Sequence, residues 1–436
     1  DSVGNVIIRK PATKNFENRK TIVLQSHLDM VHQKNGTTIF DFDNEGINML
    51  IEGDWVTADG TTLGADNGMG VAAIMSILSS KKIQHPNIEA LFTIDEETGM
   101  TGAMGLEAGL LEGEILLNLD TEEDDEIGMG CAGGIDVTAT GKYPEEVTPQ
   151  KTIGFSITVK GLNGGHSGMD IHKGLGNANK IMNRLLFDGF SKFGLRISEI
   201  NGGSLRNAIP RESNAIIAID KISQKIFLRN IELLIAQIKN EFLSIEPNLT
   251  IEIQEIASPE KVMELNIQEN FIRAVYTSLN GVYRMSPTIS GLVETSNNIA
   301  KVTVQKGLIK VKCLIRSSSE SNKQDLTNSL KSAFELAGFE VELSGEYPGW
   351  QPNVNSKILE IVSNIYEDLH GEKAHVAACH AGLECGILGQ NYPKMDMVSF
   401  GPTILGAHSP DEKVSISSTQ KFWRFLQEIL KNIPKK

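Results

Sequence analysis

Histidine and carboxylate residues that could bind divalent cations occur at five separate places along the chain. In chain order they are His27, Asp66, Glu97, Asp120 and His408. Two cations held side by side require several imidazoles and carboxylates that converge on one crevice, with at least one carboxylate shared between the ions. Asp66 suits the shared position, because the glycines around it allow the backbone to bend and to turn both carboxylate oxygens outward. The residue types therefore predict a dinuclear metal centre.

Two further carboxylates indicate how such a centre would work. Glu96 directly precedes Glu97, and adjacent buried carboxylates repel each other unless cations lie near them. While Glu97 binds a cation, Glu96 can take a proton from a water molecule, so Glu96 is the predicted general base. Asp29 follows His27 by two residues, on the same side of an extended strand, where it can accept the ring N–H and fix the imidazole.

Each of these features has a more ordinary interpretation when it is taken alone. A His-x-Asp sequence at a strand end is more often a local hydrogen bond, and an aspartate among glycines usually belongs to a turn. An acidic run such as Asp95 to Glu97 is often a solvated surface, and the run from Thr121 to Glu126 is interpreted in that way. The order of the motifs favours the metal centre, because the acidic and histidine motifs follow successive apolar segments.

The segments that would position these side chains have the composition of strands. Runs rich in apolar residues cover 21–31, 88–95 and 114–120, and a segment with helical spacing covers 68–80. The alternation of strands and helices predicts an α/β domain with a mostly parallel sheet flanked by helices. Because open sheets of this kind form their crevices at the carboxyl ends of the strands, the strand-terminal side chains are expected to lie together there.

The character of the sequence changes twice, which predicts one domain inserted into another. Residues 1–143 and 346–436 form the predicted catalytic domain, and residues 144–345 form a predicted α+β insert. The insertion follows from the long sequence separation between His408 and the other candidate ligands. The chain begins in a turn that leads into an apolar strand, so we expect a preceding N-terminal segment to be missing.

The charge and apolar content of the chain indicate which partners and which cellular location it could have. The 436 residues include 41 Lys and Arg against 55 Asp and Glu, a net charge of −14 that disfavours nucleic acid and anionic membranes as partners. No apolar run approaches the roughly 20 residues of a membrane helix, and no signal peptide is recognisable. Four cysteines without a CxxC pair indicate reduced thiols. The sequence thus predicts a soluble cytoplasmic protein.

Several motifs together resemble the M20 family of metallopeptidases. They are H-L-D-M-V from His27, G-A-D-N-G-M-G from Gly64, D-E-E-T-G from Asp95, N-L-D up to Asp120 and G-A-H-S-P-D-E around His408. The resemblance covers essentially the whole chain, and within the family it is strongest to the bacterial aminoacyl-histidine (Xaa-His) dipeptidases. Such long matches are highly specific.

The resemblance implies a role for each residue of the predicted centre. It implies two ligand pairs and one bridging residue: His27 with Asp120, Glu97 with His408, and Asp66 between them, followed by a cis peptide bond. Glu96 would be the general base, and Asp29 would orient His27. The donor types favour two zinc ions, and cobalt or manganese would fit the same donors.

The resemblance also assigns functions to the insert. The insert would act as a lid and as the contact surface of a homodimer, and it would supply His166, in G-G-H-S-G, to the scissile carbonyl. Arg316 would hold the terminal carboxylate of a peptide, because a guanidinium group pairs well with a carboxylate. The other expected substrate contacts are Asn207, Asn298 and Gly382, with Glu384 lining the pocket beside Gly382.

These interpretations predict a metal-dependent hydrolase of dipeptides, with Xaa-His dipeptides, including carnosine-like molecules, as substrates. Alternatives remain at this stage. A deacylase of N-acyl amino acids could use the same centre, and a non-catalytic peptide-binding relative could keep the fold, although binding alone would not require Glu96. A structural calcium site fits less well, because calcium prefers oxygen ligands to imidazole.

Overall fold

The computed structural model describes all 436 residues, which form two compact units. Unit 1 consists of Asp1–Cys131 and Gly349–Lys436, and unit 2 consists of Ala132–Pro348. The first boundary therefore lies earlier than the predicted insert, 144–345. The difference arises at β8 (Gly133–Lys142), which pairs along its length with strands of unit 2 and not with the sheet of unit 1.

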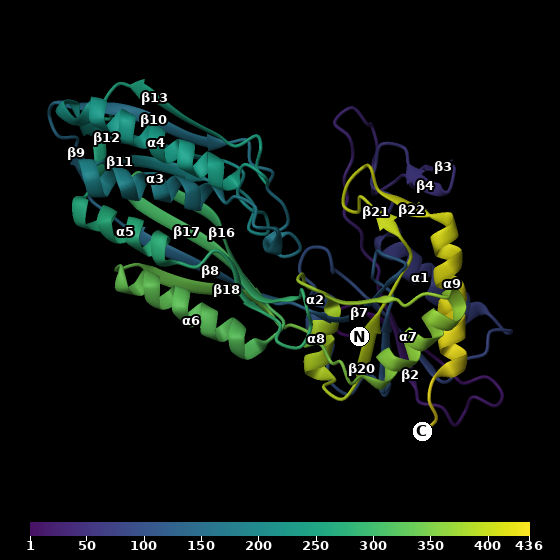
Figure 1. The fold of residues 1–436 in the computed structure, drawn as a ribbon. Coiled ribbons are helices and arrows are strands. Elements are labelled where there is room, and N and C mark those ends of the chain that lie inside the picture. Colours follow the sequence, from purple (N-terminus) through teal and green to yellow (C-terminus); the bar gives the residue numbers. More distant parts are fainter. The chain divides into compact units, whose positions relative to one another are not determined.

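The main sheet of unit 1 has seven strands, of which β2, β7 and β20 are labelled in Figure 1. In their order across the sheet they are β1 (Val6–Lys10), β5 (Ile88–Thr93), β2 (Ile22–His27), β6 (Ile115–Asn118), β20 (Asp396–Ser399), β7 (Glu126–Cys131) and β19 (His375–Cys379). The four central strands β5, β2, β6 and β20 run parallel to one another, whereas β1 is antiparallel to β5. The mostly parallel sheet agrees with the predicted α/β class.

The central strands are buried because their side chains contribute to cores on both sides of the sheet. Every residue of β2, β5 and β6 is buried, as expected for parallel strands covered by helices. The pairing sets His27 of β2 beside Thr93 of β5, and Gln25 of β2 beside Asn118 of β6. The carboxyl ends of three adjacent strands therefore meet at one edge of the sheet.

Five helices and a small antiparallel sheet complete unit 1. The helices are α1 (Ala65–Ser79), α2 (Thr101–Gly105), α7 (Lys357–His370), α8 (Glu384–Asn391) and α9 (Ile416–Asn432). The small sheet contains β21 (Ile404–Leu405), β22 (Lys413–Ser415), β4 (Trp55–Ala58) and β3 (Met49–Glu52). Serine side chains begin two of the helices: Ser356 caps α7 and Ser415 caps α9 by accepting backbone N–H groups of the first turn.

Unit 2 is built on a nine-stranded antiparallel sheet with four long helices. Eight strands follow the order β13 (Thr250–Ile256), β10 (Thr152–Lys160), β12 (Ser213–Asp220), β11 (Arg196–Gly202), β16 (Val293–Gln305), β17 (Leu308–Ser317), β8 and β18 (Glu340–Tyr347), and β15 (Gly281–Met285) pairs with β16. A separate short pair consists of β9 (Glu145–Val147) and β14 (Lys261–Met263). The helices are α3 (Ala178–Phe193), α4 (Gln224–Phe242), α5 (Leu265–Thr277) and α6 (Glu320–Leu336).

Alternate residues of the unit 2 strands enter one core together with residues of the four helices. Ile135, Val137 and Ala139 of β8 belong to this core, as do Phe227 of α4 and Phe334 of α6. This alternation is typical of an antiparallel sheet that is covered by helices on one face. The unit is therefore an α+β structure, as predicted.

The segment 301–317 is part of a hairpin and not one continuous strand. β16 ends at Gln305 and β17 begins at Leu308, so two residues form the turn. Lys306 and Gly307 both have positive φ, 49° and 78°, as in the type I′ turns that join two twisted strands. Glycine adopts this conformation without steric cost, which explains its place in the turn.

Two observations concern the predicted absence of a membrane helix and the predicted reduced state of the cysteines. No helix combines the length and the apolar character required to cross a membrane. All four cysteines are free, and Cys131, Cys313 and Cys385 are buried. Burial raises the pKa of Cys131 to about 11 and that of Cys313 to about 12, so these thiols remain protonated at neutral pH.

Candidate metal centre

The predicted ligands belong to unit 1 and come from three strand ends and two loops. His27 is the last residue of β2, while Asp120 and Glu97 follow shortly after the ends of β6 and β5. Asp66 lies in the first turn of α1, and His408 lies in the loop between β21 and β22. The strand order places the first three beside one another, and the two loops complete the set.

Asp66 connects two pairs of these residues. Its Oδ1 lies 3.2 Å from His27 Nε2, and its Oδ2 lies 3.2 Å from His408 Nε2. His27 Nε2 also lies 3.4 Å from Asp120 Oδ1, and His408 Nε2 lies 3.0 Å from Glu97 Oε2. The side chains thus form two groups, His27 with Asp120 and His408 with Glu97, and each group faces a different oxygen of Asp66.

The donor atoms fit divalent cations. One atom from each of His27, Asp66 and Glu97 lies within 4.8 Å of the other two. Glu97 Oε1 is buried and has no hydrogen-bond partner, which leaves an acceptor that a cation would satisfy. Mixed imidazole and carboxylate donors suit zinc and similar transition metals. The residues present therefore fit the donor types that divalent cations require.

The pKa values of the two histidines show how strongly the site favours positive charge. Burial opposes protonation of His27, but the charge of Asp120 and hydrogen bonds to the neighbouring carboxylates outweigh burial and raise the pKa of His27 far above its ordinary value. Hydrogen bonds to Asp66 and Glu97 raise the pKa of His408 to about 10. Divalent cations would supply the same positive charge in place of the ring protons.

Glu96 lies in an environment suited to proton transfer. Burial, followed by repulsion from Asp120, raises the pKa of Glu96 to about 9. A carboxyl group with this pKa keeps its proton at neutral pH unless positive charge lies nearby. Because bound cations would lower the pKa toward neutrality, Glu96 could both accept and release a proton beside them.

Asp29 anchors the backbone that carries Glu96 and Glu97. Its two carboxylate oxygens accept the backbone N–H groups of Glu96 and Glu97, each at 3.1 Å. Burial would raise the pKa of Asp29, but hydrogen bonds from His27 and from these two N–H groups lower it to about 2. His27 Nδ1 lies 3.0 Å from the backbone carbonyl oxygen of Asp29 and 3.6 Å from its carboxylate. Asp29 therefore faces the His27 ring with both groups, and its backbone carbonyl oxygen is nearer to Nδ1 than the carboxylate from which the orienting role was predicted.

The backbone at the start of α1 turns Asp66 toward both imidazoles. The residue before the helix, Gly64, has a φ of 73°, and the Asp66–Asn67 peptide bond is cis, as the family resemblance implies. The side chain of Asn67 donates to the carbonyl oxygen of Leu119 at 2.8 Å and to the carboxylate of Asp120. Asn67 thus connects the Asp66 loop with Asp120. Asn67 was not among the predicted site residues, although its place beside Asp66 was an available signal.

Glu412 is a second residue to which the sequence analysis gave no role. It is 2% exposed, and its carboxylate accepts the four consecutive backbone N–H groups of residues 63–66 at 2.7 to 3.3 Å. The available signal was its place at the end of the G-A-H-S-P-D-E motif that contains His408. Its carboxylate therefore contacts the same loop that presents Asp66.

A chain of buried polar side chains crosses the main sheet just before the ligands. Glu384, the first residue of α8, accepts through Oε2 from Gln25 Nε2 and Thr93 Oγ1, both at 2.6 Å. Gln25 Oε1 accepts from Asn118 Nδ2 at 2.5 Å, and Asn118 Oδ1 accepts from Ser399 Oγ at 2.5 Å. All five side chains are fully buried. Glu384 was expected to line the substrate pocket. It is instead fully buried and connects α8 to the central strands.

In unit 2, His166 and Arg316 place two hydrogen-bond donors side by side. His166 Nε2 lies 3.2 Å from Arg316 Nη2, while His166 Nδ1 accepts the backbone N–H of Met169 at 3.0 Å. Burial, followed by the charge of Arg316, lowers the pKa of His166 to about 4, so the ring is neutral at neutral pH. A neutral ring that accepts at Nδ1 carries its proton on Nε2. Two adjacent donors of this kind are suited to bind an oxygen atom of a carbonyl or carboxylate group.

The three other expected substrate contacts have different surroundings. Asn207 is exposed, and Gly382 is partly exposed in the loop before α8. Asn298 is 1% exposed, and its side chain accepts from Asn177 at 3.2 Å and donates to the carbonyl oxygen of Ala208 at 2.8 Å. These contacts favour a structural role for Asn298, in contrast to the expected substrate contact.

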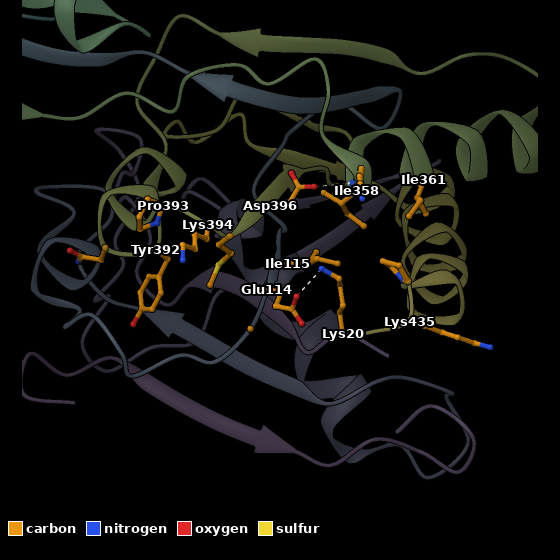
Figure 2. Close-up of a pocket in the computed structure, with 15 residues that line it drawn as sticks. Lys20, Glu114, Ile115, Ile358, Ile361, Tyr392, Pro393, Lys394, Asp396 and Lys435 are labelled. Atoms are coloured by element: carbon orange, nitrogen blue, oxygen red, sulfur yellow. Dashed lines mark hydrogen bonds and ion pairs between the residues drawn. The ribbon is translucent and has the colours of Figure 1, made fainter. Parts of the chain in front are cut away.

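A hollow of about 660 Å³ in unit 1 lies at the amino ends of the central strands (Figure 2). Its lining includes Glu114 and Ile115 at the start of β6 and Asp396 at the start of β20, whereas the predicted ligands follow the carboxyl ends. Lys20 donates to Glu114 at 2.7 Å, and Asp396 accepts the backbone N–H of Ile358 at the start of α7. None of the predicted site residues lines this hollow, so we assign it no part in the chemistry of the centre.

A comparison of the chain with known families identifies the family to which it belongs. Residues 23–432 match Peptidase family M20/M25/M40, and the chain therefore belongs to this family. The match spans both segments of unit 1 and all of unit 2. The predicted family and fold class are thereby confirmed.

The alignments to individual relatives cover all or nearly all of the chain. The sequence is 46% identical over 438 aligned residues to the cytosol non-specific dipeptidase of Escherichia coli K12, and the alignment covers 100% of this chain and 90% of that protein. The crystal structure of aminoacylhistidine dipeptidase from Vibrio alginolyticus matches with a TM-score of 0.94 and 48% identity, covering 100% of this chain and 89% of the other. Aminopeptidase PepT from Bacillus cereus, at 17% identity and a TM-score of 0.53 over 99% of this chain and 84% of its own, shares the fold.

Proposed function

We propose that this protein hydrolyses dipeptides with two divalent cations held by the centre in unit 1. The observation that carries the proposal is the geometry of Asp66, whose two carboxylate oxygens face two separate histidine and carboxylate pairs. The E. coli and V. alginolyticus relatives, both similar over the whole chain, are dipeptidases by name. When bound, the cations would polarise the peptide carbonyl group and lower the pKa of a water molecule.

Glu96 is the general base of the proposed reaction. Its carboxylate takes a proton from the attacking water, and the water oxygen forms a bond to the carbonyl carbon of the peptide. The same carboxyl group then gives this proton to the peptide nitrogen as the C–N bond breaks, so Glu96 ends the cycle in its starting state. Asp29 supports this role because it holds the backbone N–H of Glu96.

His166 and Arg316 are proposed to bind oxygen atoms of the substrate. Neutral His166 donates a hydrogen bond from its Nε2–H group to the carbonyl oxygen, where negative charge develops in the transition state. Arg316 binds the terminal carboxylate, for which a planar guanidinium group provides parallel donors. Asn207 and Gly382 are proposed as further substrate contacts, with unit 2 acting as a lid.

Xaa-His dipeptides, including carnosine-like molecules, are the proposed substrates, and a deacylase activity toward N-acyl amino acids is the alternative. Ala-His, β-Ala-His, Ala-Ala and N-acetyl amino acids should be compared as substrates of the purified protein. We expect both histidine dipeptides to be hydrolysed faster than any N-acetyl compound. Hydrolysis of N-acetyl amino acids without any dipeptide cleavage would refute the proposed substrate class.

Zinc is the proposed metal, with two ions for each chain. Elemental analysis of the purified protein should find two equivalents, and chelation should abolish hydrolysis until zinc is added back. A fully active protein without bound metal would refute the proposal. We also propose a cytoplasmic location, which the name of the E. coli relative supports, and a homodimer formed through unit 2, which light scattering after size-exclusion chromatography would test.

A further inference from the structure

Glu412 is a buried carboxylate that is held by backbone N–H groups alone. Oε2 accepts from the N–H groups of Leu63 and Gly64 at 2.7 and 3.0 Å, and Oε1 accepts from those of Ala65 and Asp66 at 2.8 and 3.3 Å. No lysine, arginine or histidine forms an ion pair with it, although it is 2% exposed. Successive N–H groups that converge on one anion in this way form a well-defined anion-binding loop.

The four N–H groups belong to the segment that presents Asp66. This segment leads into α1, and the residue before the helix, Gly64, has no side chain that could accept the free N–H groups of the first turn. Glu412 accepts them from a remote part of the chain. The loop between Gly64 and Asp66 is therefore shaped by Glu412 as well as by its own sequence.

Glu412 also follows His408 in the same loop, four residues later. His408 contacts the side chain of Asp66 through Nε2, whereas Glu412 contacts the backbone of Asp66. One loop therefore contacts Asp66 at two points, its carboxylate and its backbone N–H group. A displacement of this loop would move a ligand of one cation and the residue shared by both.

We propose that Glu412 is a positioning residue that sets the place of Asp66 before any cation binds, an inference that rests on the proposed dinuclear centre. A carboxylate that bridges two ions must present each oxygen in a different direction, so small errors in its backbone weaken both sites. Replacing a residue that hydrogen-bonds to a metal ligand typically weakens metal affinity by about 10- to 100-fold. Glu412 takes no part in proton transfer and does not contact the substrate.

Glu412→Gln tests the proposal because the amide has almost the same shape as the carboxylate. Both oxygens of Glu412 are required, since each accepts two N–H groups. In glutamine an NH2 group replaces one oxygen, so two hydrogen bonds are lost and donors face donors. Glu412→Asp keeps both oxygens and the charge on a shorter side chain, and it should recover part of what the glutamine variant loses.

Glu89→Gln is the matched control. Glu89 is 3% exposed, lies near the amino end of β5, and accepts the backbone N–H groups of Glu112 and Gly113 through Oε2 at 2.7 and 2.9 Å. Its replacement also disturbs a buried carboxylate that accepts backbone N–H groups, but at the end of the strands remote from the ligands. A general loss of stability should therefore affect both variants, whereas a change at the metal centre should affect Glu412→Gln alone.

Three measurements separate the outcomes. In metal-free protein, hydrogen exchange of residues 63–66 should be faster in Glu412→Gln than in the parent and unchanged in Glu89→Gln. Competition with a chelator should show zinc binding weakened by about 10- to 100-fold in Glu412→Gln, less in Glu412→Asp and not at all in Glu89→Gln. The visible absorption spectrum of cobalt-substituted protein should change in Glu412→Gln and stay the same in Glu89→Gln.

Parent-like zinc affinity and parent-like exchange at 63–66 in Glu412→Gln would overturn the positioning role. An equal loss of zinc affinity in Glu89→Gln would overturn it too, because the effect would then be one of stability. Should Glu412→Gln fail to fold, the aspartate variant decides, and unchanged zinc affinity in it would count against the proposal. If the parent itself binds no zinc, the proposed function fails, while the exchange measurement still reports whether Glu412 orders the loop.

Discussion

Replacing Glu384 by glutamine is expected to change the unfolding free energy of unit 1 in a pH-dependent way. Relative to the parent, the variant should be more stable at pH 8 than it is at pH 4. The carboxyl group of Glu384 is fully buried, and its Oε2 accepts hydrogen bonds from Gln25 and Thr93. Glutamine has nearly the same shape, and its carbonyl oxygen can accept the same two hydrogen bonds. The substitution therefore removes a buried ionisable group and keeps its contacts.

The magnitude follows from the pKa of Glu384. Burial raises this pKa from 4.5 to about 7, so between these pH values the folded protein keeps a proton that the unfolded chain has lost. The stability associated with neutral Glu384 is complete below pH 4.5 and is lost as the pH rises through 7. Because one pKa unit corresponds to about 1.36 kcal/mol, the parent loses about 3 kcal/mol over this range. The glutamine variant should not show this loss.

Urea unfolding of metal-free protein between pH 4 and pH 8 measures the effect. The three tryptophans, Trp55, Trp350 and Trp423, all belong to unit 1, so tryptophan fluorescence follows the unfolding of that unit. The difference in unfolding free energy between variant and parent should rise by about 3 kcal/mol from pH 4 to pH 8. A difference that does not depend on pH would refute the reasoning. Glu384→Ala is the control, because it leaves two buried donors without an acceptor, at a cost of about 1 to 3 kcal/mol each, and should be less stable than Glu384→Gln throughout.

Three further predictions concern the proposed chemistry. Glu96→Gln is expected to lower kcat by about 10²- to 10⁴-fold while both metal ions stay bound, and steady-state kinetics with a parental kcat would exclude a base role for Glu96. Asp66→Ala removes the two oxygens that face His27 and His408, so elemental analysis should find fewer than two zinc ions per chain, and an undiminished content would argue against bridging. Arg316→Lys should raise KM for dipeptides more than it lowers kcat, since an ammonium group lacks the parallel donors of guanidinium, and an unchanged KM would contradict carboxylate binding by Arg316.

The strand-end positions of the candidate ligands could be predicted because local sequence determines where the strands end. The apolar runs that contain β2, β5 and β6 are each followed within a few residues by a histidine or a carboxylate, and parallel pairing brings these ends together. The predicted strand over 21–31 extends beyond the observed end at His27. The chain leaves the sheet there, because the Asp29 carboxylate turns toward the backbone of Glu96 and Glu97.

The supporting residues could not be predicted because their partners are remote in sequence. Gln25 and Asn118 lie inside apolar runs, and only the fold shows that they join Glu384 and Ser399 in one hydrogen-bonded chain. Glu412 follows a recognised motif, but nothing local indicates that it binds the backbone of 63–66. The insert boundary was missed for a similar reason, since the assignment of β8 depends on strands that follow much later in the chain.

The connections between the two units have a consequence for the order of folding. Within unit 1, Cys131 and Trp350 exchange two backbone hydrogen bonds, and within unit 2, Gly134 pairs with Tyr347. A folded unit 2 thus holds its own two ends close together. It therefore joins the two segments of unit 1 as a short loop would, and bringing these segments together costs little conformational entropy. Unit 2 is one continuous segment and can form first during synthesis, whereas unit 1 also requires Gly349–Lys436, which follows unit 2 in the chain. Since His408 lies in this segment, a ribosome-bound chain would bring all five predicted cation ligands together only after unit 2 has been synthesised.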